Sequence, residues 1–247
     1  MDGPAGAPVL VLGSSLGTTA DMWRPQLDAL AERFRVVRYD HRGHGGSPAP
    51  PGPYRLDDLG ADVLGLLDHL GHERVHLGGL SLGGMVAMWV AAHASQRVDR
   101  LVLVCTSARF GPPSFWAQRA AAVRAGGLPA VADAVVDRWF TPAFAAAHPE
   151  IVGWARGMLT SCAPEGYAAC CGAIETMDLE PVLGKITAPT LVIAGADDPA
   201  TPPEHAERIA AGIPDARTAV VPDAAHLANV QQPAAVTRLL LDFLQGA

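Results

Sequence analysis

The sequence predicts a three-layer α/β fold built on a parallel sheet. Short apolar runs alternate with helical patterns along most of the 247 residues, as expected for strands that are buried between two layers of helices. Hydrophobic residues make up 49% of the chain, so it can bury a large core. Between about residues 110 and 187 the strand pattern stops, and we expect that stretch to be helical.

The elements can be assigned in order from the local pattern. Six apolar runs are expected to be strands: Val9–Leu12, Arg35–Tyr39, Val75–Leu77, Leu101–Val104, Thr190–Ala194 and Thr218–Val221. Five helices are expected beside them: about Asp21–Glu32, Leu56–Leu70, Ser81–His93, Glu204–Ala211 and Pro233–Leu244.

The strand-free stretch interrupts this alternation. It contains four helical patterns separated by Pro and Gly: Ser114–Arg124, Leu128–Phe140, Pro149–Leu159 and Glu165–Met177. We therefore predict one α/β core in two parts, residues 1–109 and 188–247, interrupted by a helical cap at residues 110–187.

Charge and composition exclude several classes of function. The formal net charge of −7 disfavours nonspecific binding of nucleic acids or anionic membranes, which requires a basic surface. An anionic substrate would need a local cation. The start of the chain does not resemble a signal peptide, and no apolar run reaches the length of about 18 residues that a membrane span requires. The four cysteines fit a reduced, cytoplasmic protein better than a disulfide framework.

The most informative motif is Gly-x-Ser-x-Gly, Gly79–Gly83, which follows the third strand and precedes a helical pattern. The glycines allow a sharp turn that holds the serine side chain clear of the sheet. The helix N-terminus behind it favours developing negative charge. Ser81 is therefore the predicted nucleophile, as opposed to a passive serine in a glycine-rich turn.

A serine nucleophile needs a base and an acid, which in this arrangement follow it along the chain. His226 lies in the loop between the last strand and the last helix, and is the predicted base. The acid is predicted to be Asp198 rather than its neighbour Asp197. His41 and His44 are weaker alternatives for the base because both precede the serine.

The other histidines are expected to be structural. His76 lies within a strand, and five others lie in helices or at helix ends and are expected at the surface: His69, His72, His93, His148 and His205.

An oxyanion hole is also required. One donor is predicted to be the backbone N–H of Leu82, directly after the nucleophile, and the other that of Leu16, in the Gly- and Ser-rich loop after the first strand. No compact set of metal ligands and no G-x-G-x-x-G order is present. We therefore predict no metal site and no dinucleotide-binding loop.

Together these residues resemble a known family. The chain resembles the α/β-hydrolase superfamily across nearly its whole length. The resemblance lies in the strand order, in "GLSLGG", "DHRGHGGS" and "AAHLANVQQP", and in the late Asp. More narrowly, "SSLGTTADMW", "RWFTPAF" and "GYAACCGAIETMD" resemble 3-oxoadipate enol-lactonases of the β-ketoadipate pathway. This resemblance implies an α/β-hydrolase fold, a triad of Ser81, His226 and Asp198, and hydrolysis of a small anionic enol-lactone without a cofactor.

The implied substrate carries a carboxylate, so the cap must supply a cation. The candidate is "VVDRWFTP", with Arg138 for the carboxylate and Trp139 for the apolar ring face; a solvated arginine and a packed tryptophan are the structural alternative. If Arg138 does not bind the carboxylate, the next candidates in the cap are Arg119, Arg124 and Arg156.

One feature departs from the family and several functions stay open. Family members usually begin with a β-hairpin, whereas only eight residues precede the Val9 strand, which indicates either a missing edge hairpin or a shortened chain. The alternative functions are a carboxylesterase, a carbon–carbon bond hydrolase, a cofactor-free perhydrolase and a noncatalytic binding protein of the same fold. The sequence predicts no oligomeric state.

Overall fold

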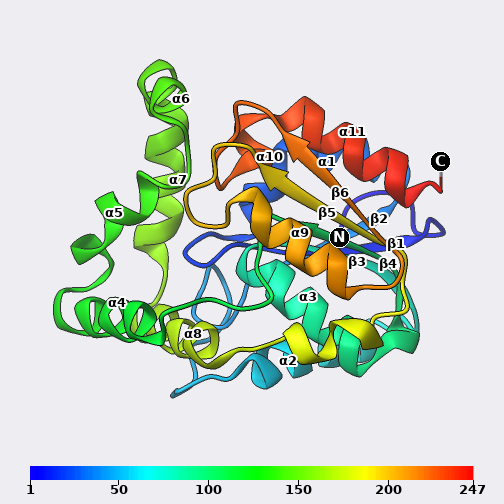
Figure 1. Cartoon of the computed structure of the whole chain (residues 1–247), viewed down its shortest axis with the longest axis horizontal. Coiled ribbons are helices and arrows are strands. Elements are labelled where there is room, and N and C mark those ends of the chain that lie inside the picture. Colours follow the sequence, from blue (N-terminus) through cyan, green and yellow to red (C-terminus); the bar gives the residue numbers. More distant parts are fainter. Residues whose placement is uncertain (247) are drawn as a thin grey trace.

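A six-stranded sheet forms the centre of the molecule (Figure 1). The computed structural model describes residues 1–246; Ala247, the last residue of the predicted second core segment, lies outside the described residues. All neighbouring strands are parallel, in the order β2-β1-β3-β4-β5-β6. The strands are β1 (Val9–Gly13), β2 (Arg35–Tyr39), β3 (Val75–Leu80), β4 (Val98–Val104), β5 (Thr190–Gly195) and β6 (Ala216–Val221).

Burial follows from this order. Every residue of β3 and β5 is buried, because inner strands of a parallel sheet have helices on both faces. At the edge, β6 is exposed along much of its length. The six predicted strands are all present, and all of them except β2 extend by one to three residues beyond the predicted runs.

Helices cover both faces of the sheet (Figure 1). On one face α1 packs against α11, and on the other α2 packs against α3, which is apolar on nearly all sides and deeply buried. The helices of the core are α1 (Arg24–Ala31), α2 (Leu56–His69), α3 (Leu82–His93), α9 (Pro203–Gly212), α10 (Ala228–Gln231) and α11 (Pro233–Leu244).

Two predicted helices are wrong in detail because proline decides where they begin. Asp21–Glu32 divides into a 3₁₀ turn, Ala20–Trp23, and α1, in whose first turn Pro25 lies. Leu128–Phe140 divides into a 3₁₀ turn that contains Pro129 and a short helix, α5 (Ala132–Val136). Proline has no N–H to donate, so it fits the first turn of a helix and not its interior.

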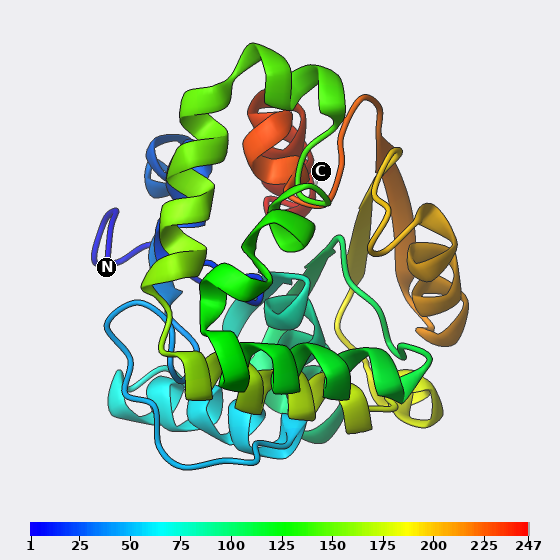
Figure 2. The ribbon, with the colours of Figure 1, turned by 90° about the vertical axis from the view of Figure 1, so that its left-hand side faces the viewer.

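The stretch predicted as a cap is helical and lies on one side of the sheet, at the end toward which the strands point (Figures 1 and 2). Its helices are α4 (Pro113–Gly126), α5, α6 (Pro142–Ala147), α7 (Pro149–Ser161) and α8 (Pro164–Thr176). The short helix α6 was not predicted. The two connections to the core run side by side, since Leu179 N–H donates to the Ala108 carbonyl at 2.9 Å and Arg109 forms a β-bridge with Asp178.

Three further findings bear on the predictions. Before β1, Asp2 forms a single antiparallel bridge with Val36 of the edge strand β2, at the end of the chain where the resemblance implies a hairpin. Within residues 1–246, no helix combines the length and the apolar character that crossing a membrane requires. The same residues contain no cluster of three or more His, Cys, Asp or Glu side chains suited to holding a metal ion.

Candidate active site

Ser81 occupies a strained turn between β3 and α3. Its φ of 56° and ψ of −115° lie in a region that residues other than glycine rarely adopt. The backbone packs so closely around this turn that two positions have no room for a side chain. A Cβ on Gly79 would lie 2.2 Å from the carbonyl carbon of Gly83, and a Cβ on Gly83 would lie 2.3 Å from the carbonyl carbon of Gly13. Only glycine fits at both positions, which is the physical reason for the spacing of the motif.

Asp198 and His226 come together from two different loops at the carboxyl end of the sheet. Asp198 follows β5 and His226 follows β6, and Asp198 Oδ2 lies 2.9 Å from His226 Nδ1. Both side chains are buried. The aspartate is held by three further donors, since its Oδ1 accepts from the N–H groups of Ala200 (2.8 Å) and Thr201 (3.1 Å) and its Oδ2 accepts from the Thr201 hydroxyl (2.6 Å).

The pKa of Asp198 reflects two opposing effects. Burial disfavours the charged carboxylate and would raise the pKa, but attraction to His226 and the hydrogen bonds from His226, Thr201 and Ala200 outweigh burial and lower the pKa to about 2. Asp198 is therefore a carboxylate at neutral pH, oriented toward one nitrogen of the imidazole ring. Its neighbour Asp197 is exposed.

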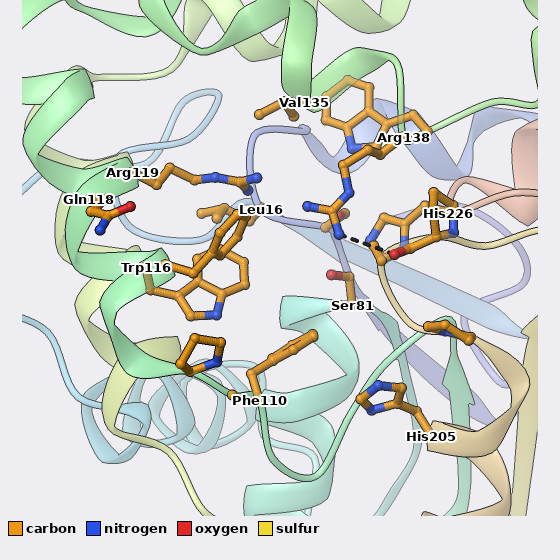
Figure 3. Close-up of a pocket in the computed structure, with 18 of the residues that line it drawn as sticks. Leu16, Ser81, Phe110, Trp116, Gln118, Arg119, Val135, Arg138, His205 and His226 are labelled. Carbon is orange, nitrogen blue, oxygen red and sulfur yellow. Dashed lines mark hydrogen bonds between the residues drawn. The ribbon is translucent and has the colours of Figure 1, made fainter.

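Ser81 and His226 line the same cavity, which has a volume of about 530 Å³ (Figure 3). Within residues 1–246 the structure records no hydrogen bond between the Ser81 hydroxyl and the ring. Such contacts are often long in the absence of substrate and tighten in the reacting complex. The structure thus brings the predicted acid and base into direct contact and places the predicted nucleophile beside them.

Two backbone N–H groups near Ser81 are free to bind an anion. Across the described residues, the N–H groups of Leu16 and Leu82 have no hydrogen-bond acceptor, although both residues are buried. Leu16 also lines the cavity. Buried backbone donors are normally paired, so a pair without acceptors beside a candidate nucleophile can stabilise an oxyanion.

The opposite wall of the cavity carries two cations, Arg119 from α4 and Arg138 from the turn after α5. Figure 3 shows both guanidinium groups directed into the cavity above Ser81. Neither belongs to an ion pair among the described residues; Arg138 donates only to the Pro199 carbonyl, at 3.3 Å. Burial, and then repulsion from Arg119, lower the pKa of Arg138, yet an arginine stays charged at neutral pH.

The other two candidate arginines are placed differently from this pair. Arg124 is bonded to Glu165 through two nitrogens, at 2.9 and 2.8 Å, and Arg156 is bonded to Asp133; all four side chains are largely exposed. Their charges are already compensated at the surface. An arginine without a carboxylate partner inside a cavity can bind an anion.

Aromatic side chains complete the cavity wall. Trp139 is buried and lines the cavity; its carbonyl accepts from Leu227 N–H at 2.9 Å, which joins the turn after α5 to the loop that carries His226. Phe115 stacks under both arginines, with its ring centroid 4.8 Å from the Arg119 guanidinium and 5.7 Å from that of Arg138. Phe110 and Trp116 also line the cavity.

Sequence reasoning missed two features of this wall. His205, which was expected at the surface, lines the cavity and lies 2.7 Å from the Ser107 hydroxyl through Nδ1; no local signal distinguishes it from other helix-end histidines. Arg119 was only a reserve candidate. Its spacing of four residues from Phe115 places both side chains on one face of a helix, and that pattern could have singled it out.

The alternative bases His41 and His44 are both buried, and neither lines the cavity. His41 Nε2 lies 3.0 Å from the Ser14 carbonyl, and His44 contacts backbone groups through both of its ring nitrogens. Burial, and then the neighbouring His44, lower the pKa of His41 to about 3. Neither ring is available to take a proton from Ser81.

Comparison with known proteins finds similar sequences along nearly the whole chain. The chain is 41% identical over 233 residues to "3-oxoadipate enol-lactonase 2" of Acinetobacter baylyi, which covers 94% of this chain and 87% of that protein. It is 36% identical to "Putative carbamate hydrolase RutD" of Variovorax paradoxus, over 98% of this chain and 93% of that protein.

A solved structure is similar over nearly the whole length. The crystal structure of the enol-lactonase from Burkholderia xenovorans LB400 superposes with a TM-score of 0.97 at 42% identity, covering 99% of this chain and 94% of that one. The sequence also matches the family described as "alpha/beta hydrolase fold" over residues 8–158 and 162–233. The chain therefore belongs to the α/β-hydrolase family.

Proposed function

We propose that the protein is a serine hydrolase that opens 3-oxoadipate enol-lactone to 3-oxoadipate. The observation that carries the proposal is the cavity, which has a Ser-His-Asp constellation on one wall and two uncompensated arginines on the other. A small ester with a negative charge fits both walls. The 41% and 42% identities to enol-lactonases support the same substrate.

The first half of the reaction is acylation. Ser81 Oγ attacks the lactone carbonyl carbon while His226 takes the hydroxyl proton. The N–H groups of Leu16 and Leu82 stabilise the negative charge on the carbonyl oxygen. The ring C–O bond then breaks, and the leaving oxygen departs as an enol or enolate, which is a better leaving group than a simple alkoxide. His226 gives its proton to this oxygen, which yields the enol and returns the ring to its neutral form, and tautomerisation in water converts the enol to the ketone.

The second half is deacylation. His226 takes a proton from water, the hydroxide attacks the acyl carbon, and the proton returns to Ser81 as the ester bond to the enzyme breaks. Asp198 keeps the imidazole in the required tautomer and stabilises its charged form. His226 thus carries the proton of the serine hydroxyl in the first half and that of water in the second, and this scheme requires neither a metal nor a cofactor.

Substrate selection is proposed to lie with residues 110–187, acting as a helical cap over the core segments 1–109 and 188–247. Arg138 binds the substrate carboxylate, and Arg119 approaches the same anion from α4. Trp139 supplies an apolar surface for the lactone ring. A guanidinium can bind a carboxylate through two parallel hydrogen bonds, which fixes the orientation of the substrate as well as attracting it.

The cellular setting is part of the proposal. All four cysteines are free and buried, as expected in the reducing cytoplasm. We propose that the protein works there on a small-molecule anion and that neither nucleic acid nor a membrane is its partner, since the net charge of −7 repels polyanionic surfaces.

Hydrolysis of a carbamate or a neutral ester is the second candidate, because a relative named as a putative carbamate hydrolase is 36% identical. Both reactions use the same triad and oxyanion hole. The two arginines without a carboxylate partner favour the anionic lactone over a neutral ester or a carbamate ester, since neither of these would compensate their charge.

A substrate panel tests the proposal. Freshly generated 3-oxoadipate enol-lactone is followed by its loss of ultraviolet absorbance, beside p-nitrophenyl acetate and a carbamate. We expect kcat/KM for the lactone to exceed both others by at least about 100-fold, because the charged carboxylate contributes on the order of 3 kcal/mol of binding to the arginines. Faster turnover of the carbamate or the neutral ester would contradict the lactonase assignment and leave the serine chemistry in place.

A further inference from the structure

Of three consecutive N–H groups in the loop after β1, the middle one has no acceptor among the described residues, and its residue, Leu16, lines the cavity. Ser15 N–H donates to the Met22 sulfur at 3.2 Å, and Gly17 N–H donates to His44 Nε2 at 2.9 Å. Between them, Leu16 N–H has no acceptor in the described part of the chain. The direction of the free donor is therefore set by the partners of its two neighbours.

His44 can play this part in only one protonation state. Its Nδ1 lies 2.9 Å from the Arg42 carbonyl, which can only accept, so Nδ1 carries the proton. Nε2 accepts from Gly17 N–H, so Nε2 carries none. The ring is thus a neutral imidazole in a single tautomer. Its complete burial agrees with this state, because burial lowers the pKa of His44.

The surroundings leave no substitute for this acceptor. Gly17 has a φ of +82°, and a Cβ there would lie 2.6 Å from Leu159 of α7 and 3.1 Å from the ring of Tyr167 of α8. The Tyr167 ring also lies against His44, with centroids 6.3 Å apart. The loop is therefore pressed between the core and the helices above it, where water cannot readily replace a lost acceptor for Gly17 N–H.

We propose that His44 is a positioning residue for the oxyanion hole: its unprotonated Nε2 holds Gly17 N–H and so directs Leu16 N–H toward the carbonyl oxygen of the substrate. This inference rests on the proposed serine chemistry but not on the identity of the substrate. His41 assists from the other end of the loop, because its Nε2 donates to the Ser14 carbonyl, which also accepts from Gly83 N–H behind the nucleophile.

The test separates the hydrogen bond from the packing of the ring. His44→Phe keeps a ring without an acceptor, whereas His44→Gln places an amide oxygen where Nε2 lies and keeps the bond to Gly17. Each variant is assayed with p-nitrophenyl acetate and with the enol-lactone. His69→Phe, an exposed histidine at the end of α2, is the matched control, and thermal unfolding confirms that each variant is folded.

We expect His44→Phe to lower kcat by about 10- to 100-fold on every substrate that the wild type hydrolyses, with KM within about twofold, because a displaced oxyanion donor acts on the transition state and not on the bound substrate. His44→Gln should recover most of this loss. If His44→Phe does not fold, His44→Leu takes its place, since it also lacks an acceptor.

Two results would overturn the inference. Equal losses in the glutamine and apolar variants would mean that ring packing, not the acceptor, supports activity, and unchanged kcat in both would mean that the loop needs no anchor at this point. A lactone rate of zero with intact p-nitrophenyl acetate cleavage in the wild type would instead contradict the proposed substrate, and the ester readout would still decide the role of His44.

Discussion

The two walls of the cavity are built on opposite principles. On the core wall, Asp198 accepts four hydrogen bonds and is fully compensated. On the wall formed by the inserted helices, Arg119 and Arg138 have no carboxylate partner among the described residues. In the proposed function the core wall is therefore organised before a substrate arrives, whereas the other wall would be completed by the substrate anion. Chemistry and selectivity are therefore separable, and substitutions on the two walls should affect different kinetic constants.

The largest effect is expected from the core wall at Ser81. Ser81→Ala removes the proposed nucleophile, so kcat for the enol-lactone should fall by about 10⁴-fold or more, as in other triads. Initial rates at saturating substrate measure the loss, and labelling by a fluorophosphonate should disappear with it. A variant that keeps rates within about tenfold of the wild type would remove Ser81 from the reaction.

The second-largest effect is expected from substitution of Asp198, the carboxylate that contacts the His226 ring. Asp198→Asn preserves shape but favours the wrong tautomer of His226, so kcat should fall by about 10³- to 10⁴-fold while KM changes little. The exposed neighbour provides the matched control, because Asp197→Asn should leave both constants unchanged. If the two aspartates exchange these outcomes, the choice between them made from the loop sequence is wrong.

Substitution on the opposite wall should act on binding instead. Arg138→Ala and Arg119→Ala should each raise KM for the anionic lactone by about 10- to 100-fold, which corresponds to about 1.5–3 kcal/mol for a hydrogen bond between charged groups. Neither should alter KM for p-nitrophenyl acetate by more than about twofold. Arg124→Ala, whose partner Glu165 lies at the surface, is the control. An equal rise for the neutral ester would mean that the arginines shape the cavity and do not select charge.

The smallest effect concerns the histidines that support the core wall, and it is a pH dependence of stability. His41 has a pKa of about 3 in the folded protein, below its ordinary 6.5, so between these values the unfolded chain binds a proton that the folded protein does not. The stabilisation is fully present above pH 6.5 and is lost as the pH falls toward 3.

His41→Gln removes this proton uptake and keeps a donor for the Ser14 carbonyl. Between pH 6 and 4, its free energy of unfolding should therefore depend less steeply on pH than that of the wild type, by about 1.4 kcal/mol per pH unit. Urea unfolding at several pH values measures the slope. Identical slopes would show that His41 is protonated in the folded protein.

The strands and the candidate catalytic residues of the core wall could be predicted from the sequence because their signals are local. An apolar run that ends at Gly79–Gly83 predicts a sharp turn, and the loops after the last two strands contain Asp198 and His226. Since parallel strands end at one edge of a sheet, residues that follow different strands meet in space. The contact of 2.9 Å between Asp198 and His226 is the outcome of that rule.

The other wall could be predicted only in part. Arg138 and Trp139 were expected on one helix from Leu128 to Phe140, but Pro129 belongs to a separate 3₁₀ turn and the helix that follows, α5, ends at Val136, before both residues. Which arginines keep a free charge depends on carboxylates distant in sequence, such as Glu165 for Arg124. Periodicity carries no information on those pairings.

By itself, then, the sequence determined the α/β architecture, the strained turn at Ser81 and the loops that carry its candidate partners, because each depends on neighbouring residues and on strand direction. Only the tertiary structure decided that Arg119 joins Arg138 in the cavity, that His205 lines it, and that His44 anchors Gly17. These depend on contacts between segments that the chain brings together only after the helices have packed over the sheet.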